Sequence, residues 1–316
     1  MEQQRLDVTP PMTETPAARL PHISVCVCTY KRQRLLLKLL TELRDQDTGG
    51  RFTYSIVIAD NDQSRSAEPL VSEFVATSTI PIRYCVEARQ NIPLARNKAV
   101  QNAAGDFIAF IDDDEFPTRK WLLLLFEALE KYGVDGVIGS VLPHFDKEAP
   151  KWVVKGKFYE RPTYPTGIVL EGRQGRTNNV LLKKELFDSE SEPFNPQFRS
   201  GEDQDFFGRM VKKGRCFTWC DEATVYECVE PVRWNRTFMV RRSALQGSTE
   251  PLVPHARFRR NAVSLVAVPV YAIALPFAMI IGQHYFMSLL VRLSYHVARL
   301  LAQVGVDLVK EPYVTS

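Results

Sequence analysis

One stretch of the chain constrains its fold more than any other: residues 105–117, which read GDFIAFIDDDEFP. Five consecutive apolar residues, 107–111, run directly into four acidic residues, 112–115. A short apolar run without a polar face predicts a strand that is buried on both sides, as in the middle of a parallel sheet. The acids then lie at the carboxyl end of that strand, where ligands bind in open α/β sheets.

The closely spaced acids also indicate a kind of ligand. Several neighbouring carboxylates repel one another unless a cation or many hydrogen-bond donors compensate. Carboxylate oxygens are hard ligands that suit Mg²⁺ or Mn²⁺, and these ions in turn hold phosphates. The stretch therefore indicates a metal–phosphate site. The alternative is the acidic N-terminus of a following helix, where Asp and Glu are favoured.

The chain around this stretch alternates between predicted strands and helices. Strands are expected over residues 22–29, 54–59, 82–86, 107–111, 134–141 and 178–182, and helices over 33–46, 66–77, 92–104 and 119–131. Alternation of this kind, with polar residues at successive strand ends, predicts an α/β fold with a doubly wound, mostly parallel sheet.

Composition narrows the possible partners and compartments. The net charge of +3 over 316 residues is too small to indicate a nucleic-acid partner. Residues 1–20 are polar and contain no apolar segment, so we expect a disordered leader and not a secretory signal. Six cysteines occur without paired CxxC motifs, which favours separate reduced thiols. A thiolate cluster of Cys216, Cys220 and Cys228 is the alternative.

Residues 231–316 predict a basic and apolar helical region that associates with a membrane. Residues 262–281 carry no charge and are long enough to span a bilayer, and the neighbouring arginines of 257–260 fit a cytoplasmic flank. Pro269 and Pro276 leave a kinked or re-entrant helix open. An amphipathic helix is expected over 286–304. The alternative is a buried core helix.

Three acidic sites lie far apart in the sequence: Asp60-Asn61-Asp62, Asp112–Asp114 and Glu202-Asp203. The first two follow strands of one predicted sheet and can line one crevice. Transfer from a nucleotide sugar needs one carboxylate for the base or ribose, a set for a metal on the diphosphate, and one to take the acceptor proton. Arg96, at the start of a helix, adds a cation for phosphate. GxGxxG and GxxxxGK[ST] are both absent, which disfavours dinucleotide dehydrogenases and P-loop enzymes.

Five segments together resemble the family 2 inverting glycosyltransferases of the GT-A fold. They are VCVCTYKR, IVIADND, QNIPLARNKAV, GDFIAFIDDDEFP and GEDQDF. The resemblance covers roughly residues 22–230. With the basic and apolar C-terminal region, the chain looks most like bacterial exopolysaccharide glucosyltransferases of the succinoglycan-biosynthesis type, which extend a lipid-linked oligosaccharide at the inner face of the plasma membrane.

The resemblance implies roles for individual residues. The nucleotide would be bound by Thr29, Arg32, Asp60, Asp62, Arg96, Asn97, Asp112 and Asp113. Asp112 and Asp114 fit the D-x-D motif, with Asp114 the preferred ligand of Mg²⁺ or Mn²⁺, although the triple Asp allows two frames. Asp203 matches the general base, and Glu202 faces the acceptor or holds the loop. Asn179 is expected near the donor sugar.

Simpler readings of three sites stay open. Asp203 could be only a helix N-cap, and Asp60 only a turn-forming residue. Arg241 and Arg242 could hold an acceptor diphosphate or anionic lipid, or belong to a solvated basic face.

The chain departs from the family pattern at two places. Where many relatives carry a metal-binding His, the sequence has Glu227, so that role falls to Glu227 or to no residue. The QxxRW motif of processive synthases is incomplete, because Glu230 stands before Arg233-Trp234. A single-addition enzyme is therefore expected.

The predicted function is transfer of a hexose, glucose by resemblance, from a UDP-sugar to a lipid-linked saccharide, without nucleic acid. The catalytic domain would span residues 21–230, on the cytoplasmic face of a bacterial inner membrane. A nucleotidyltransferase is one alternative, although it would carry a Gly-rich basic loop where this chain has CTYKR. A non-catalytic membrane-bound scaffold is another.

Overall fold

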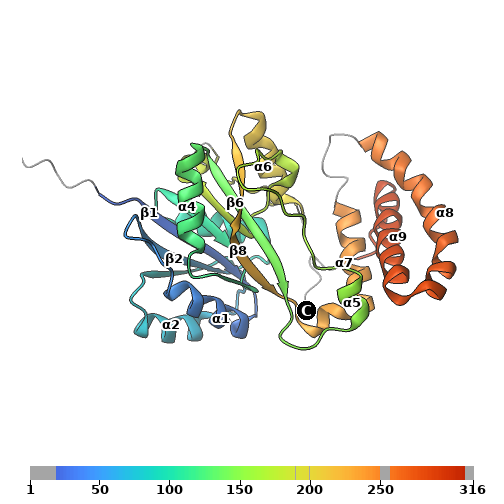
Figure 1. Cartoon of the computed structure of the whole chain (residues 1–316), viewed down its shortest axis with the longest axis horizontal. Helices are drawn as coiled ribbons and strands as arrows, with labels where there is room; N and C mark the ends of the chain where they lie inside the picture. The colour runs from blue at the N-terminus through green and yellow to red at the C-terminus, as the bar shows by residue number, and fades with distance from the viewer. Residues whose placement is uncertain (1–18, 189, 199, 250–256, 310–316) are drawn as a thin grey trace, which may run out of the picture.

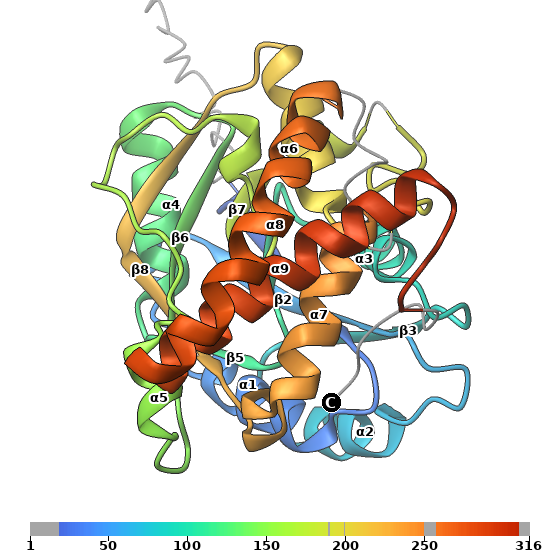
Figure 2. The same cartoon turned by 90° about the vertical axis from the view of Figure 1, so that its right-hand side faces the viewer.

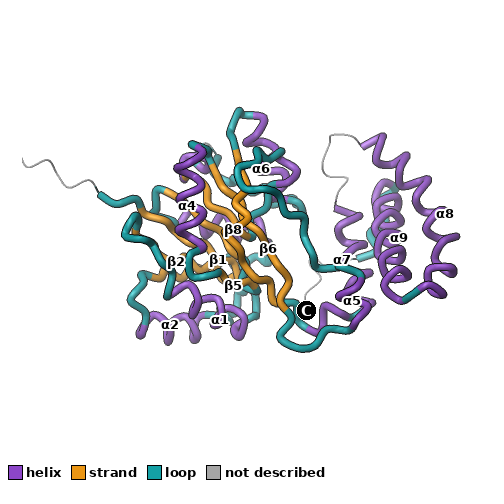
Figure 3. Tube along the Cα trace, viewed as in Figure 1, coloured by secondary structure: helices purple, strands orange, loops and turns teal. Residues whose placement is uncertain are grey.

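The computed structural model describes residues 19–309 apart from 189, 199 and 250–256. An eight-stranded mixed sheet occupies the centre of the described chain, in the order β3-β2-β1-β4-β7-β6-β8-β5 (Figures 1 and 3). The strands are β1 (His22–Thr29), β2 (Thr53–Asp60), β3 (Ile82–Val86), β4 (Phe107–Ile111), β5 (Glu115–Pro117), β6 (Gly136–His144), β7 (Asn179–Lys183) and β8 (Phe217–Cys228). The predicted leader, residues 1–20, lies outside the described residues except for its last two.

Helices follow most of these strands. They are α1 (Gln33–Arg44), α2 (Glu68–Thr77), α3 (Ile92–Asn102), α4 (Trp121–Tyr132), α5 (Lys151–Lys155), α6 (Glu202–Lys212), α7 (Arg236–Thr249), α8 (Arg257–Ile281) and α9 (Gln283–Gln303). Three short 3₁₀ segments, η1 (Gly172–Gln174), η2 (Lys184–Phe187) and η3 (Pro231–Trp234), complete the described elements.

The first half of the sheet is parallel, as predicted. β1 pairs in parallel with both β2 and β4, and β2 pairs in parallel with β3. In this register Thr29 lies beside Asp60, so the carboxyl ends of these strands share one edge. β7 runs antiparallel between β4 and β6, which makes the sheet mixed while the α/β prediction is confirmed.

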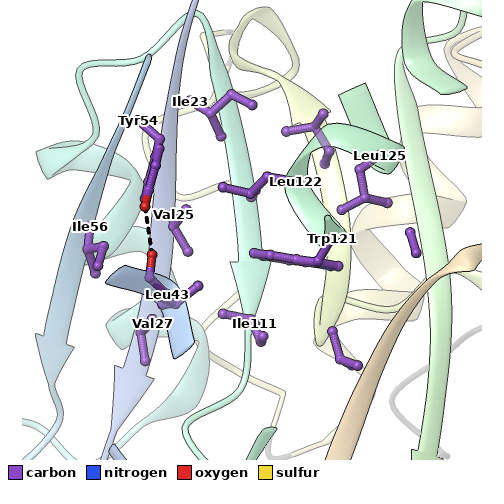
Figure 4. Close-up of a cluster of buried hydrophobic side chains, with 14 of the residues drawn as sticks. Ile23, Val25, Val27, Leu43, Tyr54, Ile56, Ile111, Trp121, Leu122 and Leu125 are labelled. Atoms are coloured by element: carbon purple, nitrogen blue, oxygen red, sulfur yellow. Dashed lines mark hydrogen bonds between the residues drawn. The ribbon is translucent and has the colours of Figure 1, made fainter. Parts of the chain in front are cut away.

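Helices cover both faces of the sheet because alternate strand residues point to opposite sides. Figure 4 shows one face, where Val25 of β1 and Ile111 of β4 pack against Trp121 of α4. In the same core the Tyr54 hydroxyl donates a hydrogen bond to the Leu43 carbonyl at 2.7 Å. Cys26, next along β1, points to the other face, in the core that holds residues of α3 and α6.

The short strand β5 was not predicted. The loop after β4 ends at Asp114, and Glu115, the last acid of the run, already pairs in antiparallel fashion with Glu227 of β8. Glu115 is buried, so the four acids of the sequence are three acids in a loop and one in a strand. This pairing brings β8 alongside the acids.

Helices α7, α8 and α9 pack together beside the sheet, with α9 contacting both of the others. Figures 1 and 2 show α7 nearest the sheet and α8 outermost. Of the described helices, only α8 contains a segment, Asn261–Ile281, that is long and apolar enough to cross a membrane. Its apolar side chains are largely exposed, including Ile273 at 69% and Ile280 at 86%. The predicted basic and apolar helical region, 231–316, begins with two separate elements, η3 and α7.

Candidate active site

The acids of residues 112–114 line a cavity of about 600 Å³ at the carboxyl edge of the parallel strands. Thr29 and Arg32 reach this cavity from the end of β1, and Arg96 reaches it from α3. The site residues that the structure brings together as predicted are Thr29, Arg32, Arg96, Asp112, Asp113 and Asp114. The sheet register explains this meeting, because β1 lies directly beside β4.

The three acids differ in their partners. Asp113 accepts hydrogen bonds from the Thr29 hydroxyl at 2.8 Å and from Arg32 Nη1 at 3.0 Å. Asp114 accepts from Arg32 Nη1 at 3.3 Å and from Arg233 Nη1 at 3.2 Å. The Asp112 side chain is 42% exposed, and Arg96 Nη2 lies 3.9 Å from it. Asp112 is therefore the most open of the three carboxylates.

The electrostatics of the acids suit a divalent cation. Partial desolvation in the cavity and the neighbouring Asp114 raise the pKa of Asp112 to about 6, although the positive charge of Arg96 lowers it. Burial and Asp114 raise the pKa of Asp113 to about 6 as well, although Arg32 opposes this. Mg²⁺ is commonly held by one or two carboxylates plus substrate phosphates, which is the donor set that Asp112 and Asp114 provide. Among the described residues, no group of three His, Cys, Asp or Glu side chains forms a metal site.

Glu227 lies near this donor set and is paired with two arginines. Its carboxylate oxygens lie 2.6 Å from Arg161 Nη2 and 2.7 Å from Arg233 Nη2. Burial alone would raise the pKa of Glu227, but Arg161 and Arg233 lower it to about 2. Both readings of this position, a metal ligand in place of a His or no ligand, stay predictions.

Glu202 and Asp203 begin α6 beside the cavity. The buried Glu202 forms an ion pair with Arg96, which holds the start of α6 against α3. The N-cap is Gly201 in a left-handed conformation (φ 87°), and Asp203 lies inside the first turn, so reading Asp203 as the N-cap is wrong. Burial and the neighbouring Glu202 raise the pKa of Asp203 to about 6, while Arg96 opposes this.

The structure does not place Asp60 and Asp62 on the cavity surface. Asp60 is fully buried, and its carboxylate accepts hydrogen bonds from the Asp62 and Ala67 amides and from the Tyr84 hydroxyl at 2.8–3.1 Å. Asp62 is buried too and turns back on its own loop. The nucleotide contacts of these two acids stay predictions. Asn61, between them, lines the cavity instead.

Asn97 also has a structural position. It is buried on α3, donates a hydrogen bond to the Phe194 carbonyl at 2.8 Å, and accepts one from the Phe194 amide at 2.9 Å. Its side chain therefore fixes the segment that precedes α6. The nucleotide contact of Asn97 stays a prediction.

Asn179 lies in the interior of the sheet with no exposed surface. Its amide group donates to the carbonyls of Ser140 and Ala223 at 2.8 and 2.7 Å, and its oxygen accepts from Trp121 Nε1 at 2.7 Å. Every polar atom of the side chain is thus used inside the protein, and the contact with a donor sugar stays a prediction.

Sequence reasoning missed three arginines that line the cavity: Arg161, Arg233 and Arg242. Arg161 follows α5 in a stretch rich in Gly and Pro, and such a composition predicts a loop but no functional residue. Arg233 belongs to the RW pair that was considered only for processive synthesis. Arg242 was noted with Arg241, but the two differ, because Arg241 is exposed and only Arg242 faces the cavity.

Comparison with known proteins identifies the chain. Residues 24–189 match the profile of the family described as Glycosyl transferase family 2. Over 230 residues the chain is 34% identical to the succinoglycan biosynthesis protein ExoM of Rhizobium meliloti, which covers 72% of this chain and 74% of ExoM. The chain belongs to glycosyl transferase family 2. It is also 27% identical over 168 residues to the glycosyltransferase AglE of Haloferax volcanii, covering 53% of this chain and 48% of AglE.

The solved structures confirm the fold of this family 2 glycosyltransferase. Residues 1–349 of TarS from S. aureus superpose with a TM-score of 0.51 at 15% sequence identity, covering 90% of this chain and 92% of that one. A TarS structure in complex with UDP-GlcNAc gives a TM-score of 0.50 at 17% identity, with the same coverage. At these identities the likeness shows the GT-A fold that the sequence predicted.

Proposed function

We propose that this family 2 glycosyltransferase transfers a hexose, glucose, from a UDP-sugar to a lipid-linked saccharide during synthesis of an exopolysaccharide or another cell-surface glycan. One observation carries the proposal: Thr29, Arg32, Arg96 and the acids of 112–114 line a single cavity. Two relatives add support, since ExoM is named for succinoglycan biosynthesis and TarS is recorded with UDP-GlcNAc.

The residues of this cavity divide the work of a single displacement. Arg32 and Arg96 would face the diphosphate of the donor, with Thr29 and Asn61 beside the nucleoside. Asp112 and Asp114 would hold Mg²⁺ or Mn²⁺, which supplies positive charge against the departing nucleoside diphosphate. The pair of Glu202 and Arg96 positions α6 at the cavity.

Asp203 is the proposed general base. With a pKa near 6 it is deprotonated at neutral pH and still basic enough to take a proton from an acceptor hydroxyl. The hydroxyl oxygen then forms a bond to the anomeric carbon while the bond to the diphosphate breaks on the opposite side. The product has the inverted anomeric configuration, and the proton stays on Asp203.

The membrane location belongs to the same proposal. Residues 21–230 would form the catalytic domain on the cytoplasmic face of a bacterial inner membrane, and residues 231–316 the membrane-associated region. Support comes from the exposed apolar surface of α8, the outermost helix.

The decisive experiment measures UDP release from a panel of UDP-sugars with Mg²⁺ or Mn²⁺ and a membrane extract as acceptor. Asp203→Asn should lower the transfer rate by about 10²- to 10⁴-fold while UDP still binds. Asp205→Asn is the matched control, because Asp205 lies on the same helix but pairs with Arg209, and it should retain transfer.

Two outcomes would count against the proposal. Transfer that survives in Asp203→Asn would remove Asp203 as the base. No turnover of any donor, together with no binding of UDP, would favour the non-catalytic scaffold.

A further inference from the structure

A second cavity, of about 270 Å³, adjoins the first and is walled by arginines. It shares Arg161, Glu227, Arg233 and, from α7, Arg242 with the first cavity. It adds Arg176, from the loop before β7. We call this second space the arginine cavity. Its four arginines face two glutamates, Glu227 and Glu160, and Glu160 is already paired with Lys157 at 3.0 Å.

The positive charge of the arginine cavity is only partly compensated. Arg161 and Arg233 are paired with Glu227. Arg176 and Arg242 form no hydrogen bond or ion pair with any described residue. The buried Nε of Arg233 likewise has no acceptor in the described structure. Burial, together with Arg161 beside Arg176 and Arg233 beside Arg242, lowers the pKa of both unpaired guanidinium groups.

Both arginines are half-buried, and cations held without a partner in such a place favour a compensating anion, because desolvating an unpaired charge is costly. We propose that the arginine cavity binds the phosphate or diphosphate group of the acceptor, an inference that rests on the proposed transferase function. Two unpaired guanidinium groups match the two negative charges of a diphosphate diester. Guanidinium forks also bind phosphate oxygens in a bidentate manner.

The position of the arginine cavity favours a phosphate that a lipid carries. Its walls include Met239 and Arg242 of α7 and Val291 of α9, and the apolar helix α8 packs on α9. Figure 2 shows α7 and α9 crossing in front of the sheet, and Figure 1 shows α8 beyond them. The arginine cavity thus adjoins the first cavity and also reaches α9, on which the apolar helix α8 packs. A lipid-linked acceptor has the same order of sugar, phosphate and apolar chain.

The test titrates inorganic pyrophosphate, without divalent ions, into the full chain saturated with UDP and into the chain without UDP. Arg176→Gln and Arg242→Gln should each weaken pyrophosphate binding by about tenfold or more. Arg176→Gln should also leave UDP affinity unchanged, because Arg176 lines the arginine cavity and not the first cavity. Arg173→Gln is the matched control, since Arg173 is exposed in the same loop and pairs with Glu171. Arg242→Lys keeps the positive charge and should bind pyrophosphate better than Arg242→Gln. Thermal melts of all variants show whether a loss of pyrophosphate binding comes from misfolding.

Three results separate the possibilities. Pyrophosphate that UDP fully displaces would place the anion in the donor cavity and overturn the inference. Equal binding by wild type and both Gln variants would overturn it as well. Absence of UDP binding to a folded wild type would contradict the proposed function, while the titration without UDP would still report on the arginine cavity.

A second measurement identifies the source of the phosphate. Phosphatidylcholine vesicles that contain a polyprenyl diphosphate should bind the wild type more tightly than vesicles of phosphatidylcholine alone, and Arg176→Gln should remove that difference. Binding of free pyrophosphate but not of the vesicle-borne diphosphate would overturn the assignment to a lipid-linked acceptor.

Discussion

At the scale of single residues, the buried amide of Asn179 links Trp121 of α4 to the backbone carbonyls of Ser140 and Ala223. Asn179→Ala leaves these three buried groups unpaired. We expect the free energy of unfolding to fall by about 2–4 kcal/mol, while the KM for the donor stays unchanged in the folded fraction. Urea unfolding and steady-state kinetics measure the two quantities.

The control for this prediction is Asn195→Ala, since Asn195 accepts only a local hydrogen bond from the Gln197 amide in a surface loop. It should change stability little. A raised KM in Asn179→Ala with unchanged stability would restore the sugar-binding role that the sequence suggested.

The role of Asp203 as a base predicts how kcat/KM depends on pH. A base must be deprotonated, so kcat/KM should fall as the pH decreases through about 6, the pKa of this carboxyl. Because Glu202 raises that pKa, Glu202→Gln should move the fall to a lower pH. The pH profile of kcat/KM for both proteins measures the shift. An unmoved profile would assign the titration to another group, such as Asp112.

At the scale of elements, α8 exposes apolar side chains that a soluble helix would normally cover. Replacing both Ile273 and Ile280 with Asp should abolish sedimentation with vesicles of phosphatidylglycerol and phosphatidylcholine, with little change in melting temperature. Val169→Asp is the matched control, because Val169 is 68% exposed but lies far along the chain from α8. Unchanged sedimentation of the double variant would show that α8 is not the attachment surface.

The sequence predicted most elements well and some side-chain directions poorly. Continuous apolar runs such as 107–111 marked the central strands, because a strand buried on both faces has no polar positions. The three residues of β5 are too few to show any period. Asp60 and Asn61 are indistinguishable in the sequence as polar residues at a strand end. Hydrogen bonds from the Tyr84 hydroxyl and from two backbone amides hold the acid inward. The position of Arg161 in the cavity could not be predicted, because the path of the loop that carries it depends on tertiary contacts.

At the scale of the whole molecule, the edge of the sheet concentrates carboxylates that repel one another. A divalent ion that binds only the folded state should stabilise it, by about 2–3 kcal/mol at 100 times its Kd. We expect Mn²⁺ with UDP to raise the melting temperature of the wild type, and the rise to be much smaller in Asp112→Asn. Differential scanning calorimetry measures both.

Asp45→Asn, at the exposed end of α1, is the control for that experiment and should respond to Mn²⁺ like the wild type. An equal rise in Asp112→Asn would show that Asp112 does not hold the ion. Removal of the metal with a chelator should reverse the effect, since the added stability comes from binding of the ion to the folded state.

Asp114 lies between Arg32, which follows β1, and Arg233, which belongs to η3. The site thus carries its own counter-ions before any substrate arrives. If Asp114 holds a divalent ion together with a diphosphate, Arg32 and Arg233 would be free to pair with the phosphate oxygens. Donor binding is then an exchange of partners among charges already present, so its affinity depends less on salt concentration than the number of arginines alone suggests.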